Sequence, residues 1–184
     1  EFRRAKGLID QAYSEVIEEG VEVKSPEIGV LIEVPAAVYQ AQQLARRVDF
    51  LSVGSNDLTQ YLLAVDRNNT RVADLYHAYH PAVMECLLTV VRAAHAEGKP
   101  VGICGELAGD PGAVLLLMAM GYDMLSRNDS SLLKVKAVVR GARYSELSDL
   151  LERVMKSDTA DEVKLMVRAA LVDFGMEKLA PPSQ

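Results

Sequence analysis

Four short apolar runs, separated by segments of helical periodicity, constrain the fold of this chain most strongly. The runs predict buried strands at residues 28–33, 48–53, 100–104 and 122–126. Strands that alternate with helices in this way form parallel βα units. A complete (β/α)8 barrel needs eight such units and about 250 residues, whereas this chain has four units in 184 residues. We therefore expect half of such a barrel or, as the alternative, a small doubly wound sheet.

The composition limits the class of function. The chain is 49% hydrophobic and 25% charged, as in an ordinary globular domain, and its formal net charge is −6. An acidic chain of this kind argues against nucleic acid or an anionic membrane as a partner, because phosphates require basic surfaces. No apolar run approaches the ~20 residues needed to cross a bilayer. Two cysteines without metal-site spacing favour a reducing, cytoplasmic location.

We expect four segments along the chain. Residues 1–27 form a leading helix and connection, 28–140 the half barrel, 141–176 the C-terminal helices and 177–184 a flexible tail. Helical periodicity predicts helices at residues 1–20, 36–47, 58–63, 81–98, 111–120, 132–140, 144–155 and 160–174. The chain begins without methionine, and a half barrel exposes two strand edges. We therefore expect a longer gene product whose earlier part supplies the missing strands, or a second copy that covers the edges.

Polar residues follow each predicted strand. Glu33 comes after the first run, Asn56 and Asp57 after the second, Cys104 at the end of the third and Ser126 at the end of the fourth. The carboxyl ends of parallel strands meet at one mouth of a barrel, and barrel enzymes hold their chemistry there. These polar ends make the half barrel the preferred fold and predict a site at its mouth.

Each candidate also has a structural alternative. Glu33 could cap the following helix, and Asn56 or Asp57 could serve as an N-cap, which is a common use of these residue types. Cys104 could be a small buried hydrophobe, as most free cysteines are. Arg67, in the polar loop after the second unit, could clamp an anion or be an ordinary surface charge.

Other polar residues are expected to be structural. His77 and His80 lie among aromatic residues, which is weak evidence for a metal or a general base. His95 lies near the end of a predicted helix, where it suits the helix dipole. Glu106 and Asp110 could tune the neighbouring thiol or cap the next helix, and we favour the structural role for both.

Three motifs in chain order carry a family resemblance. They are Ile32-Glu-Val-Pro-Ala-Ala37, Ser52-Val-Gly-Ser-Asn-Asp-Leu-Thr-Gln-Tyr61 with Asp66-Arg67, and Gly102-Ile-Cys-Gly-Glu-Leu-Ala-Gly-Asp110. Together they resemble the C-terminal phosphoenolpyruvate-binding TIM barrel of enzyme I of the bacterial phosphotransferase system. The nitrogen-regulatory (PtsP) type looks closest, through Glu33-Val-Pro-Ala-Ala-Val-Tyr39 and Val65-Asp-Arg-Asn-Asn69. Pyruvate phosphate dikinase and phosphoenolpyruvate synthase share the site more distantly.

The resemblance implies a metal and substrate site. Glu33 and Asp57 match the Mg2+ ligands of the family, and Mg2+ suits one or two carboxylates with substrate oxygens completing its shell. Asn56 and Arg67 match residues that hold the phosphate of phosphoenolpyruvate. The backbone at Ser55 lines the same pocket. Arginine can neutralise and orient a phosphate through its forked donors.

The resemblance also implies an acid and an activity. Cys104 matches the thiol that exchanges a proton with the methylene carbon of enolpyruvate, and a thiol of pKa ~8.5 is mostly protonated near neutrality. The implied enzyme is a phosphoenolpyruvate-protein phosphotransferase. Its phosphoryl group passes to a histidine on a separate domain and then to a histidine-containing phosphocarrier protein (HPr-like). The family domain also forms a homodimer.

This chain departs from the family in two ways. The phosphorylated histidine domain and the first half of the barrel, with its further arginines, are absent, so we expect the chain not to run the whole transfer by itself. Autophosphorylation by phosphoenolpyruvate would refute that expectation. In the segment 126–131, Arg127 and Asp129 replace residues that are apolar or small in the family.

Two other functions remain open. A Mg2+-dependent pyruvate-enolate lyase or aldolase would use the same carboxylates on a related barrel but would not need the Cys104 motif. A non-catalytic dimerisation module would instead use apolar helix surface. For that module we expect spare apolar surface on the helices at 81–98 and 111–120.

Overall fold

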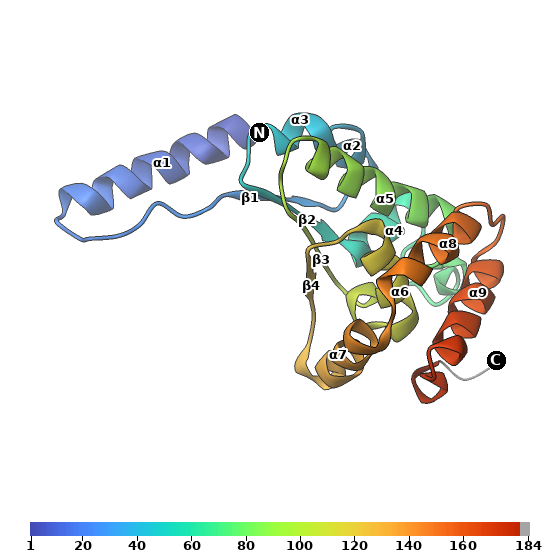
Figure 1. Ribbon diagram of the computed structural model, residues 1–184. Helices are drawn as coiled ribbons and strands as arrows, with labels where there is room; N and C mark the ends of the chain where they lie inside the picture. The colour runs from blue at the N-terminus through green and yellow to red at the C-terminus, as the bar shows by residue number, and fades with distance from the viewer. Residues whose placement is uncertain (181–184) are drawn as a thin grey trace.

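The computed structural model describes residues 1–180 and contains one four-stranded sheet (Figure 1). Its strands are β1 (Gly29–Ile32), β2 (Phe50–Gly54), β3 (Val101–Cys104) and β4 (Met124–Ser126), in that spatial order and all parallel. Each strand end lies within two residues of its predicted position. The sequential strand order, with helices between the strands, confirms the α/β fold expected of the C-terminal half of a (β/α)8 barrel.

The helices account for most of the remaining chain. They are α1 (Phe2–Glu18), α2 (Pro35–Tyr39), α3 (Ala41–Ala45), α4 (Ser55–Leu63), α5 (Pro81–Ala96), α6 (Pro111–Met120), α7 (Leu132–Gly141), α8 (Tyr144–Val154) and α9 (Ala160–Asp173). Short 3-10 turns lie at η1 (Ala73–Leu75), η2 (Leu107–Gly109), η3 (Asp129–Ser131) and η4 (Glu177–Leu179). Residues 181–184, at the end of the expected tail, lie outside the described residues. No helix among residues 1–180 is long and apolar enough to cross a membrane.

The prediction of one continuous helix at residues 36–47 is wrong. The structure divides it into α2 and α3 at Gln40, whose φ of −105° and ψ of 5° leave the helical range. The Gln40 N–H donates to the Ala37 carbonyl oxygen at 3.1 Å and closes the first short helix. No glycine or proline marks this break in the sequence, so residue type alone did not predict it. Pro35 does open α2, as its fixed φ favours.

Only one face of the sheet is covered by helices. Alternate strand residues that face the helices are fully buried, including Leu51, Val53 and Ile103. On the opposite face, one residue of each strand lies in a row across the sheet. The parallel register pairs Leu31 with Ser52, Ser52 with Gly102, and Gly102 with Met124. At the two ends of this row, Leu31 is 47% exposed and Met124 is 51% exposed. The inner face of the half barrel is therefore open.

The prediction that α5 and α6 have spare apolar surface is wrong. Seven of the ten residues of α6 are buried, because α6 packs against α7, α8 and α9. The apolar side of α5 is likewise taken up by the core. Helix α1 is the opposite case, because it extends away from the sheet and buries none of its residues (Figure 1).

Candidate active site

The first feature of the site is a polar row at the carboxyl ends of the strands. The register pairs Gly54 with Cys104 and Cys104 with Ser126, on the same open face as Leu31. Glu33 follows β1 directly and lies against Gly54, where a built Cβ would come within 2.4 Å of Glu33 Oε1. Gly54 thus leaves the space that the Glu33 carboxylate occupies. The alternative that Glu33 caps the next helix is wrong, because α2 has no side-chain cap.

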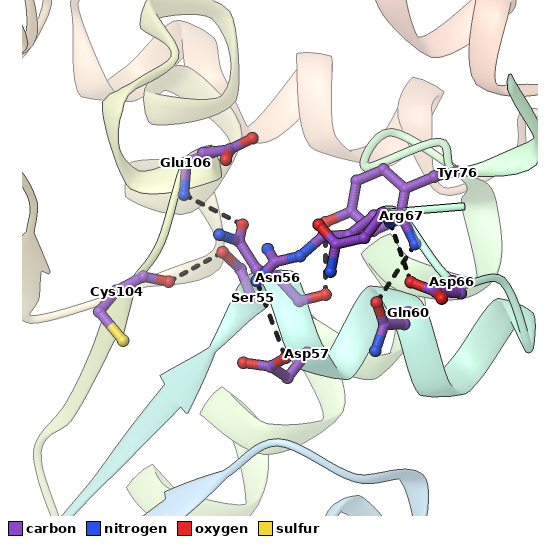
Figure 2. A network of polar contacts seen from close by, with 10 residues as sticks. Ser55, Asn56, Asp57, Gln60, Asp66, Arg67, Tyr76, Cys104 and Glu106 are labelled. Carbon is purple, nitrogen blue, oxygen red and sulfur yellow. Dashed lines mark hydrogen bonds and ion pairs between the residues drawn. The ribbon is translucent and has the colours of Figure 1, made fainter. Parts of the chain in front are cut away.

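Helix α4 begins immediately after β2, without the loop that the sequence suggested. Its N-cap is Gly54, so Asn56 and Asp57 lie in the first turn, and the N-cap alternative for these two residues is wrong. Ser55 is 2% exposed, and its Oγ donates a hydrogen bond of 2.8 Å to the Cys104 carbonyl oxygen (Figure 2). This bond ties the first turn of α4 to the end of β3.

Asn56 is held from two directions. The Glu106 backbone N–H donates to Asn56 Oδ1 at 3.2 Å, and the Tyr76 hydroxyl donates to the Asn56 carbonyl oxygen at 3.3 Å (Figure 2). Burial is the main cause that raises the pKa of Tyr76, so its hydroxyl stays protonated and can donate. Sequence reasoning treated Tyr76 only as part of a weak aromatic and histidine cluster, because its partner is a backbone atom of a distant segment.

Arg67 lies beside this turn and is half-buried, which argues against an ordinary surface charge. Its Nη2 is 3.9 Å from Asp57 Oδ1, a long ion pair that engages one of the five guanidinium N–H donors at most weakly. Its backbone N–H donates to Gln60 Oε1 at 3.2 Å, so α4 positions the loop that carries it. The preceding Asp66 accepts from the Asn68 backbone N–H at 2.9 Å and shapes the turn.

The electrostatics of the site centre on Cys104. Partial burial and then the negative charges of Glu33 and Asp57 raise the pKa of this thiol. Two carboxylates from different strand–helix units therefore both disfavour the ionised form of one thiol. The thiol is only partly buried, so it is accessible from the barrel mouth and is not an inert core group.

The donor set fits a hard cation. Glu33 and Asp57 offer carboxylate oxygens, which Mg2+ prefers over nitrogen or sulfur. Within residues 1–180 there is no cluster of three or more acidic, histidine or cysteine ligands. Mg2+ does not require one, since it commonly keeps waters and substrate oxygens in its shell. The two carboxylates could therefore hold Mg2+ together with an anionic substrate.

The remaining polar candidates have structural partners. Asp110 caps α6 by accepting from the backbone N–H groups of two residues in its first turn, and it also accepts from the Tyr79 hydroxyl. His80 caps α5 through its Nδ1, and His95 Nε2 lies 3.0 Å from Asp123 Oδ2. The structural roles favoured for Asp110 and these histidines are confirmed.

The atypical segment after β4 packs against the η2 turn. The Arg127 guanidinium lies on Gly109, where a built Cβ would overlap Nη1. Arg127 Nε also donates to the Asn128 carbonyl oxygen at 2.9 Å. Ser126, which was expected at the mouth, lies there in register with Cys104 and is exposed.

Comparison with known proteins shows the family of the chain. Residues 1–144 match the family described as PEP-utilising enzyme, PEP-binding domain. The chain is 45% identical over 177 residues to the Escherichia coli (strain K12) protein named phosphoenolpyruvate-dependent phosphotransferase system, covering 96% of this chain and 24% of that protein. It is 43% identical over 169 residues to the phosphoenolpyruvate-protein phosphotransferase of Enterococcus faecalis, covering 91% of this chain and 29% of that one.

The chain thus spans roughly a quarter of the length of these relatives. A crystal structure of a citrate lyase from Burkholderia xenovorans LB400 superposes with a TM-score of 0.55 at 17% identity, covering 93% of this chain and 60% of the lyase. At that identity the likeness shows the fold alone. The family match over most of the chain, with relatives above 40% identity, shows that the chain belongs to the PEP-binding domain family of the PEP-utilising enzymes.

Proposed function

We propose that this chain is the phosphoenolpyruvate-binding part of a phosphoenolpyruvate-protein phosphotransferase. The whole enzyme would move the phosphoryl group of phosphoenolpyruvate, with Mg2+, to a histidine on a separate domain. From there the group would pass to a histidine-containing phosphocarrier protein of the nitrogen-regulatory type. The family membership and the named relatives support the enzyme class. The motif resemblance supports the nitrogen-regulatory type, the carrier and a homodimer.

One observation carries the proposal. Glu33 and Asp57 belong to two successive strand–helix units, and their negative charges both raise the pKa of the Cys104 thiol, which belongs to a third unit. The burial and the two charges keep this thiol protonated above the pH at which an ordinary cysteine ionises. A protonated thiol at the mouth of a barrel, beside two oxygen ligands for Mg2+, suits the delivery of a proton to an enolate carbon.

Phosphate binding would fall to the first turn of α4 and the loop that follows it. Arg67 keeps donors beyond its long ion pair with Asp57 and can take two phosphate oxygens at once. The side-chain amide of Asn56 supplies further N–H donors from the same turn. These groups would orient phosphoenolpyruvate with its phosphate toward α4 and its methylene carbon toward Cys104.

The reaction can then be followed on the residues of this chain. The bond between phosphorus and the enol oxygen breaks as the histidine nitrogen of the separate domain takes the phosphoryl group. The enolate left behind takes the Cys104 proton on its methylene carbon and becomes pyruvate, and the thiolate regains a proton from solvent. Mg2+ held by Glu33 and Asp57 would stabilise the negative charge of the enolate.

The histidines of the chain support an acceptor elsewhere. His80 is used as a helix cap and His95 faces Asp123 across the other end of the sheet. His77 has no described contact with a residue of the site. We therefore expect no phosphorylation of this chain by phosphoenolpyruvate alone.

Exchange of the pyruvate methyl protons tests the proposed chemistry without the histidine domain. A group that donates a proton to the enolate carbon can also remove one from the methyl group of pyruvate. In deuterated buffer with Mg2+ it therefore catalyses the replacement of the methyl protons by deuterium, which NMR follows directly. We expect catalysed exchange that Cys104→Ala abolishes and Cys86→Ser leaves intact. Exchange that survives Cys104→Ala would overturn the role of the thiol and favour the lyase alternative, which does not need it.

A further inference from the structure

Two hydrogen bonds connect the loop after β3 to the first turn of α4, and they flank Gly105. On one side, Ser55 Oγ donates to the carbonyl oxygen of Cys104 at 2.8 Å. On the other side, the Glu106 backbone N–H donates to Asn56 Oδ1 at 3.2 Å. The peptide segment that follows the proposed proton donor is therefore held directly against the proposed phosphate-binding turn.

Gly105 cannot be replaced by another residue without disturbing this contact. Its φ is +104°, a backbone conformation that residues with a side chain rarely adopt. A built Cβ would also lie 2.4 Å from Ser55 Oγ and 3.1 Å from Asn56 Oδ1. Backbone conformation and available space thus both require glycine at the point where the two segments meet.

The contact fixes which way the Asn56 amide faces. Only the amide oxygen can accept a bond from the Glu106 N–H, so the amide NH2 must point away from that N–H. Figure 2 shows the Asn56 nitrogen beside the bonded oxygen, with no dashed line to it. Within residues 1–180 the two hydrogens of this NH2 have no acceptor. The bond from Tyr76 to the Asn56 carbonyl holds the backbone of the same residue.

We propose that the Gly105–Glu106 peptide is a positioning element that presents the Asn56 NH2 group to the phosphate of phosphoenolpyruvate. The inference rests on the proposed function. A donor whose orientation is set before the ligand arrives needs no reorganisation on binding. Hydrogen bonds to an ionised phosphate are also stronger than bonds between neutral groups. Gly105 and Glu106 act through Asn56 and need not touch the substrate.

Two variants separate the contact from the donor. Gly105→Ala should break the contact, so the Glu106 amide hydrogen should exchange with solvent faster, and phosphoenolpyruvate should bind about tenfold more weakly. Asn56→Asp keeps an oxygen acceptor but has no N–H donor. It should leave the Glu106 amide protected while weakening phosphoenolpyruvate binding by at least about tenfold. Amide exchange measured by NMR and calorimetry with Mg2+ report the two effects.

Gly98→Ala is the matched control. Gly98 also has a positive φ, of +66°, and nothing lies within 4 Å of its built Cβ. This variant should leave both the Glu106 exchange rate and the affinity for phosphoenolpyruvate unchanged. A general effect of alanine at a positive-φ glycine would appear in both variants, whereas the contact with Ser55 and Asn56 is lost in Gly105→Ala alone.

The outcomes distinguish this inference from the proposed function. If the unaltered chain binds phosphoenolpyruvate and both site variants bind equally well, the positioning role is overturned and the proposed function stands. If the unaltered chain binds none, the proposed function of this chain is overturned, and amide exchange decides the contact. Faster Glu106 exchange in Gly105→Ala but not in Gly98→Ala then supports the positioning of Asn56, and equal exchange in all variants overturns it.

Discussion

At the residue scale, the protonation of Cys104 depends on two carboxylates that are remote from it in sequence. Because a negative charge disfavours the thiolate, removing either charge should lower the pKa of Cys104. In metal-free buffer of mildly alkaline pH, Glu33→Gln should therefore make alkylation of Cys104 by iodoacetamide severalfold faster. Cys86→Ser in every variant leaves Cys104 as the only thiol.

Glu106→Gln is the matched control for this prediction. It makes the same chemical change two residues from Cys104, but Glu106 is exposed and is not among the groups that raise the pKa of the thiol. Its alkylation rate should equal that of the parent chain. Equal rates in all three chains would show that the Glu33 carboxylate does not reach the thiol, and would contradict the site described above.

Sequence reasoning at this scale found residue types but not their partners. Glu33, Asp57 and Cys104 could be proposed because each follows an apolar run, and parallel strands bring such positions to one edge. The bond from Tyr76 to Asn56 was not predictable, because it joins a side chain to a backbone oxygen twenty residues away. The need for glycine at position 105 depends on its φ and its neighbours, which composition does not record.

At the scale of elements, Asp110 fixes the start of α6. Its carboxylate accepts from two backbone N–H groups of the first turn and from the partly buried Tyr79 hydroxyl. Asp110→Ala should lower the free energy of unfolding by about 1–3 kcal/mol, measured by urea denaturation, because a cap is lost and a partly buried hydroxyl loses its acceptor. Asp110→Asn keeps an acceptor oxygen and should cost clearly less. Equal losses would argue against the cap.

Close packing of α6 against α9 makes a second prediction. A Cβ built on Gly112 would lie 2.3 Å from Val167 Cγ1, and Val167 is buried. Gly112→Ala should therefore destabilise the chain by about 1–3 kcal/mol in urea denaturation. Gly7→Ala is the control in α1, where nothing lies within 4 Å of the built Cβ, and it should not destabilise the chain.

The double variant Gly112→Ala/Val167→Ala tests the cause of that loss. Removing Cγ1 of Val167 makes room for the new methyl group, so the two changes should cost less together than the sum of their separate costs. Strict additivity would mean that the helices do not meet at this point.

The elements themselves were largely predictable from periodicity, since all four strands and the long helices lie close to their expected positions. The exceptions are local. The break at Gln40 has no sequence signal, and α4 starts at Ser55, three residues before its expected position, where the Ser55 hydroxyl donates to the Cys104 carbonyl oxygen. Such differences arise from tertiary contacts, which override local preference.

At the scale of the whole molecule, helices cover one face of the sheet and leave the other open (Figure 1). Leu51 is fully buried beneath the helices, whereas Leu31 on the neighbouring strand is 47% exposed on the open face. Leu51→Ala should cost about 2–5 kcal/mol in urea denaturation and Leu31→Ala less than about 1 kcal/mol. Comparable costs would mean that the inner face of the sheet is covered.

We propose that Glu33, Asp57 and the first turn of α4 form a site for Mg2+ and phosphoenolpyruvate. Calorimetric titration of the chain with phosphoenolpyruvate, with and without Mg2+, tests this most directly, and Asp57→Ala supplies the comparison. We predict binding that requires Mg2+ and disappears in Asp57→Ala. Binding that needs no Mg2+, or that persists in Asp57→Ala, would contradict the assignment of the metal ligands. Failure of the folded chain to bind at all would contradict the claim that this part of the barrel contains a sufficient site.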